Sequence, residues 1–248
     1  MSQSIIKLAT HGVQALTPYA PGKPLSELER EYGIQNAVKL ASNENPLGPS
    51  PRVLDALRAQ FGDLARYPDG NGFALKAVLA RKHGVPMESV TLGNGSNDVL
   101  ELVARAFLSP DSAAVFSAHA FAVYPLVTQA IGARCTAAPA HDGSRGPMYG
   151  HDLDAMAESI DAQTRVVFIA NPNNPTGTWL TDKELHRFME RVSDDVIVVV
   201  DEAYFEYVVE ADYPNAMAWV VEFPNLLVTR TFSKAYGLAS LRVGYGVC

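Results

Sequence analysis

The sequence has few cysteines, no long hydrophobic run and no excess of positive charge. Its two cysteines, Cys135 and Cys248, are too few for a disulfide framework and fit a reducing compartment. No segment approaches the roughly 20 apolar residues of a membrane-spanning helix, and the N-terminus lacks the pattern of a signal peptide. We therefore expect a soluble, cytoplasmic protein that does not bind membranes.

Acidic residues outnumber basic ones, with 27 Asp and Glu against 20 Lys and Arg and a formal net charge of -7. The sequence has no basic cluster of the kind that binds nucleic acid, so we predict no nucleic-acid partner. The six histidines show no metal-ligand spacing, and we predict no metal site. The expected partner is a small molecule.

Short apolar runs alternate with amphipathic stretches from residue 90 onward. Uniformly apolar strands that alternate with helices predict a mostly parallel sheet covered on both faces, which is an α/β fold with three αβα layers. The predicted strands lie at 90–92, 113–116, 133–138, 166–169, 196–200 and 226–228. The predicted helices lie at 51–61, 74–83, 99–107, 120–131, 153–160 and 181–192, the last capped by Thr181 with Glu184.

Residues 1–50 contain many prolines and few periodic patterns, which predicts an N-terminal extension to a main domain at 51–248. Within the extension we expect a short helix at 26–32 and a short strand at 38–41. The last residues, 243–248, have the pattern of a strand with no polar segment after it. Because natural domains seldom end in this way, we expect a truncated chain.

Polar motifs follow the predicted strands, and ligands gather at the carboxyl ends of strands in parallel sheets. Four such motifs occupy residues 93–97, 171–177, 201–204 and 231–234. The first is a glycine-rich turn that leads into a helix with Ser96 as its N-cap, and such a turn presents backbone N–H groups to an anion. Its spacing matches neither the dinucleotide motif nor the P-loop, so nucleotide binding is disfavoured.

Lys234 lies just after a predicted buried strand, among hydroxyl residues. A desolvated lysine can carry a neutral amine, which forms a Schiff base with an aldehyde. Thr231, Ser233 and Arg242 supply the donors that a phosphate monoester needs. Taken alone, this segment is more typical of a surface turn with a solvated lysine. Together with the other strand-end motifs, it favours a ligand site.

Asp201 follows five apolar residues, and a buried carboxylate at that point needs a charged partner. A protonated ring nitrogen would be such a partner, and Tyr204 and Asn174 are candidate hydrogen-bond partners for a ring hydroxyl. A lysine for an aldehyde, donors for a phosphate and these ring contacts together describe pyridoxal 5′-phosphate.

The motifs at 174–177 and 201–204, together with Ser233, Lys234 and Arg242, resemble those of fold-type I pyridoxal-phosphate aminotransferases. The resemblance covers essentially the whole chain. Within that family, segments 19–24, 40–46 and 66–70 are similar to those of histidinol-phosphate aminotransferases. The resemblance implies exchange of an amino group between histidinol phosphate and 2-oxoglutarate, with glutamate as the product, in histidine biosynthesis.

The resemblance also implies a role for each site residue. Lys234 would bind the cofactor aldehyde and move the substrate Cα proton, Asp201 would hold the ring-nitrogen proton, and Tyr204 would bond the ring hydroxyl together with Asn174. The remaining implied roles are phosphate binding by Ser96, Asn97, Thr231, Ser233 and Arg242, ring stacking by Phe121, substrate cover by Tyr19 and Asn45, and contact from Tyr67 to the neighbouring subunit's cofactor. The last role implies a homodimer with shared active sites.

Three other functions stay open at this point. One is a different class II aminotransferase of aromatic or broad specificity, and another is a pyridoxal-phosphate-dependent decarboxylase of a phosphorylated amino acid. The third is a ligand-binding or regulatory module, which the intact lysine and the lack of a basic DNA-binding segment disfavour. Family members carry a C-terminal small domain that this chain lacks, to which residues 1–50 would contribute. We therefore expect weak cofactor binding at most and no useful transamination by these 248 residues.

Overall fold

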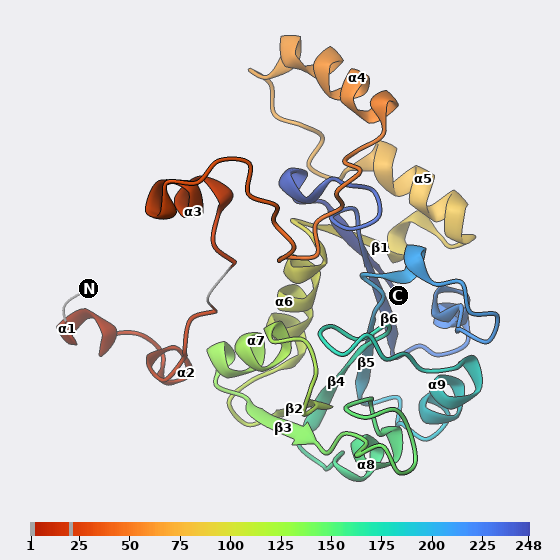
Figure 1. The fold of residues 1–248 in the computed structure, drawn as a ribbon. Helices are drawn as coiled ribbons and strands as arrows, with labels where there is room; N and C mark the ends of the chain where they lie inside the picture. Colours follow the sequence, from red (N-terminus) through yellow and green to blue (C-terminus); the bar gives the residue numbers. More distant parts are fainter. Residues whose placement is uncertain (1–2, 20–21) are drawn as a thin grey trace.

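One seven-stranded sheet forms the centre of the molecule, in the strand order β1-β7-β6-β5-β4-β2-β3 (Figure 1). The computed structural model describes residues 3–19 and 22–248. All neighbouring strands run parallel except β7, which is antiparallel to both β1 and β6. The predicted mostly parallel sheet is confirmed. The strands are β1 (Val90–Gly93), β2 (Ala113–Ser117), β3 (Arg134–Ala138), β4 (Thr164–Ala170), β5 (Ile197–Asp201), β6 (Leu226–Thr231) and β7 (Gly244–Val247).

Helices cover both faces of this sheet, as the αβα prediction requires. On one face α6 and α7 pack against the sheet through a core that includes Leu100, Tyr124 and Phe168. On the other face α5, α8 and α9 pack around Met156 and Phe188. Because both faces are buried, β4 and β5 are apolar along almost their whole length. These helices are α5 (Phe73–His83), α6 (Ser96–Phe107), α7 (Val123–Ile131), α8 (Leu153–Glu158) and α9 (Asp182–Met189).

The N-terminal segment lies to one side of the sheet and carries short helices (Figure 1). The strand predicted at 38–41 is wrong, because Val38 and Leu40 are exposed and these residues pair with no strand in the described part of the chain. Gly12 packs against the end of α7, where a Cβ on Gly12 would lie 2.1 Å from the Gln129 carbonyl oxygen. The helices of this region are α1 (Gln3–Ile6), α2 (His11–Gln14) and α3 (Leu25–Tyr32), and α4 (Pro51–Gln60) follows it.

The turn between β1 and α6 differs from the sequence prediction by one residue. Gly95, with a φ of 86°, is the N-cap, and Ser96 is the first helical residue rather than the cap. The φ of 86° with a ψ of 167° is a conformation that favours glycine, and a Cβ at position 95 would also lie 2.4 Å from Nη2 of Arg242, so that the arginine side chain would have to shift. In contrast, the predicted capping box of α9 between Thr181 and Glu184 is confirmed.

Side-chain alternation along β5 and β6 separates two sets of polar residues. Asp201 lies on the face that packs against α6 and α7, whereas Glu202 and Arg230 lie on the opposite face. Arg230 Nε donates to Glu202 Oε2 over 2.8 Å, and Nη2 lies 2.7 Å from the same oxygen. The guanidinium carbon is 3.4 Å from the centre of the Phe205 ring. Both charged groups are buried, so the pair joins the ends of β5 and β6 inside the protein.

We predict that Arg230→Met lowers the free energy of unfolding by about 3 kcal/mol, because it leaves the Glu202 carboxylate buried without its partner. Burial raises the pKa of Glu202 to about 7 against the opposing charge of Arg230. Urea denaturation above neutral pH, where the carboxylate is ionised, measures the loss.

Two further variants distinguish the loss of stability caused by breaking this buried pair from a general effect of losing an arginine. Adding Glu202→Leu to Arg230→Met is expected to recover most of the stability, since the buried Glu202 carboxylate is then removed together with its partner. Arg105→Met breaks an exposed pair with Glu101 and is expected to cost about 0.5 kcal/mol or less. Equal decreases in the free energy of unfolding for the Arg230→Met and Arg105→Met variants would contradict the prediction.

Candidate functional site

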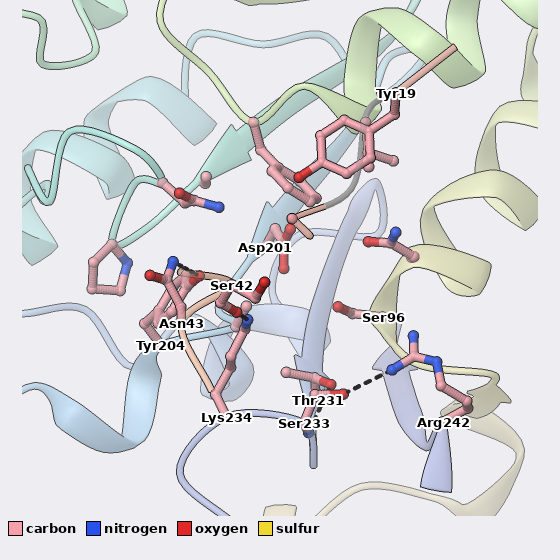
Figure 2. Close-up of a pocket in the computed structure, with 18 residues that line it drawn as sticks. Tyr19, Ser42, Asn43, Ser96, Asp201, Tyr204, Thr231, Ser233, Lys234 and Arg242 are labelled. Carbon is pink, nitrogen blue, oxygen red and sulfur yellow. Dashed lines mark hydrogen bonds between the residues drawn. The ribbon is translucent and has the colours of Figure 1, made fainter. Parts of the chain in front are cut away.

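A cavity of about 580 Å³ opens at the carboxyl ends of β4, β5 and β6 (Figure 2). All the predicted site residues line it except Tyr67 and Asn45. Those that line it are Tyr19, Ser96, Asn97, Phe121, Asn174, Asp201, Tyr204, Thr231, Ser233, Lys234 and Arg242. The parallel strands thus bring together motifs that are more than 130 positions apart in the sequence.

Part of the cavity wall combines hydroxyl groups with a guanidinium group. Arg242 Nη1 donates to Ser233 Oγ over 3.2 Å, and Nη2 donates to the Asn94 carbonyl oxygen over 3.1 Å. Ser96 lines the same cavity at the start of the 12-residue helix α6, where the positive end of the helix dipole lies. Such a set of donors can bind a doubly charged anion such as a phosphate monoester.

Gly244 of β7 is a residue that the sequence analysis missed. A Cβ at this position would lie 2.2 Å from the backbone nitrogen of Ser96, so β7 can approach the start of α6 only with glycine. The close approach holds Arg242, two residues earlier, against the helix start. The alternation of glycine in segment 243–248 is the only sequence signal of this contact.

Lys234 lies in the turn after β6 with its amine directed into the site. Its Nζ donates to the Ser42 carbonyl oxygen over 3.2 Å. Burial lowers the pKa of the amine, and the charge of Arg242 acts in the same direction, whereas Glu44 and Asp201 oppose the shift. A lowered pKa increases the share of neutral amine, which is the nucleophilic form.

Asp201 is 4% exposed and is held by two hydroxyl groups. Its Oδ1 accepts from Thr229 Oγ1 over 2.9 Å, and its Oδ2 accepts from the Tyr124 hydroxyl over 3.1 Å. Burial raises the pKa of the carboxyl group, and the two hydrogen bonds and the charge of Lys234 oppose the rise. The site therefore holds a carboxylate that a nearby positive charge would stabilise.

Tyr124 and Thr229 were missed by the sequence analysis. Tyr124 is fully buried, and its ring stacks on Phe168 with 4.9 Å between ring centres. Its sequence context is an apolar helix face, so the pattern indicates only a core residue. Thr229 lies within a buried strand, where a hydroxyl group requires a partner, and that requirement is the signal that could have indicated a link to Asp201.

Tyr204 and the N-terminal segment meet at the cavity. The Tyr204 hydroxyl accepts a hydrogen bond from Asn43 Nδ2 over 2.9 Å, and Lys234 Nζ lies 5.5 Å from the centre of the Tyr204 ring. Ser42 and Asn43 both line the cavity, and neither was predicted. Contact between residues this far apart in the sequence has no signal in a single sequence.

Tyr67 and Asn45 lie outside the cavity lining. The Tyr67 side chain is fully exposed. Asn45 Nδ2 donates to the Ala235 carbonyl oxygen over 2.8 Å, so Asn45 fastens the N-terminal segment beside Lys234. In the motif at 19–24, Tyr19 lines the cavity, whereas Ala20 and Pro21 lie outside the described residues.

A family model described as aminotransferase class I and II matches residues 35–248. The chain belongs to this aminotransferase family. Histidinol-phosphate aminotransferase 2 of Methylococcus capsulatus is 62% identical over 244 residues, which are 98% of this chain and 66% of that protein. Histidinol-phosphate aminotransferase 1 of Nitrosococcus oceani is 56% identical over 248 residues, which are 100% of this chain and 65% of that protein. The chain thus spans about 65% of the length of these curated relatives.

Among solved structures, the aminotransferase chain matches a histidinol-phosphate aminotransferase from Sinorhizobium meliloti in complex with pyridoxal-5′-phosphate. The TM-score is 0.83 at 30% identity, over 96% of this chain and 62% of that one. The match confirms the predicted fold class. In the part of the chain that the structure describes, every helix is too short or too polar to cross a membrane.

We predict that Asp201→Asn raises the stability of the ligand-free aminotransferase chain at neutral pH. A carboxyl group with a raised folded-state pKa binds its proton more tightly when folded, so the parent loses stability as pH rises from about 3.8 through the folded pKa. Asparagine does not titrate and escapes this loss. In urea unfolding at a series of pH values, the advantage of Asp201→Asn should grow across this window and then level off. A stability advantage of Asp201→Asn that shrinks as pH rises would contradict the raised folded-state pKa of Asp201.

Proposed function

We propose that this aminotransferase uses pyridoxal 5′-phosphate. The observation that carries the proposal is that one cavity holds Lys234, the buried Asp201 carboxylate and the donors of Ser233 and Arg242. Among residues 3–19 and 22–248, Asp201 forms no ion pair, and a protonated ring nitrogen would supply the missing charge. The donor set also fits a phosphate group. The residues present therefore fit this cofactor.

Each residue has a task that its position supports. When bound, the cofactor supplies an electron sink for the charge that develops at the substrate Cα. Lys234 would remove and return the proton at Cα. Asp201 would keep a proton on the ring nitrogen, and Tyr204 and Asn174 would bond the ring oxygen. Phe121 would pack on the ring, and the residues that would hold the phosphate are Ser96, Asn97, Thr231, Ser233 and Arg242.

For the whole protein we propose transfer of the amino group of L-histidinol phosphate to 2-oxoglutarate, in the cytoplasm. The names of the relatives at 56–62% identity support this choice of substrate. Residues 51–248 would form the cofactor domain, and residues 1–50 would cover the substrate with Tyr19 and Asn45. The exposed Tyr67 side chain is available to a second copy, which fits a homodimer with shared sites.

We expect the chain mixed with pyridoxal 5′-phosphate to develop a visible absorption band, because the lowered pKa of Lys234 favours reaction of its amine with the aldehyde. Borohydride reduction followed by peptide mass mapping should place the label on Lys234. The variant Lys234→Ala should lose both band and label, whereas Lys183→Ala, which changes an exposed lysine, should keep them. A label spread over surface lysines would contradict the cofactor proposal.

The substrate proposal is tested on the complete protein by comparing kcat/KM among amino donors with 2-oxoglutarate as acceptor. We expect L-histidinol phosphate to be preferred over unphosphorylated aromatic amino acids, since a phosphate group offers charge-assisted contacts that they lack. Preference for an aromatic donor, or release of carbon dioxide from a phosphorylated amino acid, would contradict it.

A further inference from the structure

Ser42 and Asn43 are adjacent residues with a left-handed backbone, at φ values of 71° and 51°. This conformation is unfavourable for residues with a Cβ, although asparagine tolerates it better than most. Strained backbone of this kind persists where the surrounding structure maintains it, often beside a functional site. Two such residues in succession at the cavity wall therefore require an explanation from their contacts.

The left-handed pair directs two groups toward residues of the site (Figure 2). The Ser42 carbonyl oxygen accepts from Lys234 Nζ over 3.2 Å. The next residue, Asn43, donates from Nδ2 to the Tyr204 hydroxyl oxygen over 2.9 Å. A single stretch of backbone thus contacts the amine and the phenol that line the cavity together.

Two other contacts fix this segment against the turn that carries Lys234. Asn45 Nδ2 donates to the carbonyl oxygen of Ala235, the residue after the lysine, over 2.8 Å. Gly237, with a φ of 68°, lies so close to Gly48 that a Cβ at 237 would be 2.5 Å from the Gly48 carbonyl carbon. The segment and the turn therefore pack as one unit, which holds the amide of Asn43 in place.

We propose that Asn43 is a positioning residue that sets the direction of the Tyr204 hydroxyl group. Because the Asn43 amide is the donor in this hydrogen bond, the Tyr204 oxygen is the acceptor and its own proton is left for another partner. Tyr204 lines the cavity, so that proton is available to a ligand oxygen. The identity of the ligand, the ring oxygen of pyridoxal phosphate, rests on the proposed function, whereas the orientation belongs to the cofactor-free chain.

The orientation is tested by NMR titration of tyrosine 13Cζ in the cofactor-free chain, with Tyr204→Phe to assign the signal. Burial raises the pKa of Tyr204, and the hydrogen bond from Asn43 opposes the rise. Asn43→Ala should therefore raise the pKa of Tyr204. Asn43→Asp, which has the same shape but can only accept from the phenol, should raise it further. An unchanged or lowered pKa in both variants would overturn the proposal. The other titratable groups around Tyr204, unchanged in these variants, are Asp201, Tyr207, Tyr19 and Lys234.

The consequence for the ligand is tested by the affinity for pyridoxal 5′-phosphate. Asn43→Ala should weaken binding about two- to tenfold, the range for one hydrogen bond. In a Tyr204→Phe background the same change should alter affinity by less than about twofold, because the hydroxyl group through which Asn43 acts is gone. Asn36→Ala is the matched control, since Asn36 is an exposed asparagine of the same segment with a φ of 61°.

If Asn43→Ala weakens pyridoxal phosphate binding equally with Tyr204 and with Phe at position 204, Asn43 acts on the fold. That result would overturn its link to Tyr204. A complete protein that binds no pyridoxal phosphate would contradict the proposed function instead. In that case the NMR titration still decides the orientation of Tyr204, so the two failures are distinguishable.

Discussion

The carboxylate of Asp201, at the end of β5, is the group on which the arrangement of the site depends. A carboxylate that is 4% exposed is unfavourable unless donors surround it, and Thr229 and Tyr124 supply two. Those donors come from the next strand and from the helix that covers the sheet. These two hydrogen bonds therefore link β5 to β6 and to α7, and the carboxylate faces a cavity that also contains a lysine.

The two faces of β5 and β6 carry different polar systems at the same level of the sheet. On the cavity face, Asp201 has hydroxyl partners and no arginine. On the opposite face, Glu202 has Arg230 as a direct partner, and Phe205 covers the guanidinium group. Adjacent residues in the sequence thus belong to a reactive site and to a structural ion pair, because strand side chains alternate. The ion pair supports the ends of the strands without placing a guanidinium group beside Asp201.

Most of the sheet and of the candidate site could be predicted because both follow local patterns. Apolar runs between amphipathic helices indicate the parallel strands, and polar residues directly after those runs converge because parallel strands end at one edge. The pattern failed at 38–41, where alternating apolar residues suggested a strand although these residues are exposed and pair with no strand among residues 3–19 and 22–248. It also missed Tyr124, Ser42 and Asn43, whose roles depend on contacts between distant segments. Such contacts are set by tertiary packing and have no local signature in one sequence.

The antiparallel strand β7 has a consequence for the order in which the site can be assembled during synthesis. It lies between β1 and β6, and residues 90–93 of β1 pair with residues 244–247 rather than with any earlier strand. As the chain emerges from the ribosome with its N-terminus first, β2 to β6 can associate before β7 is made. Until then, β1 and the start of α6 at Ser96 lack β7 as their neighbour. The donors of α6 and the lysine-bearing turn after β6 are thus joined late, through a contact of very long sequence separation. Such a topology delays ligand binding until nearly all of this chain has emerged.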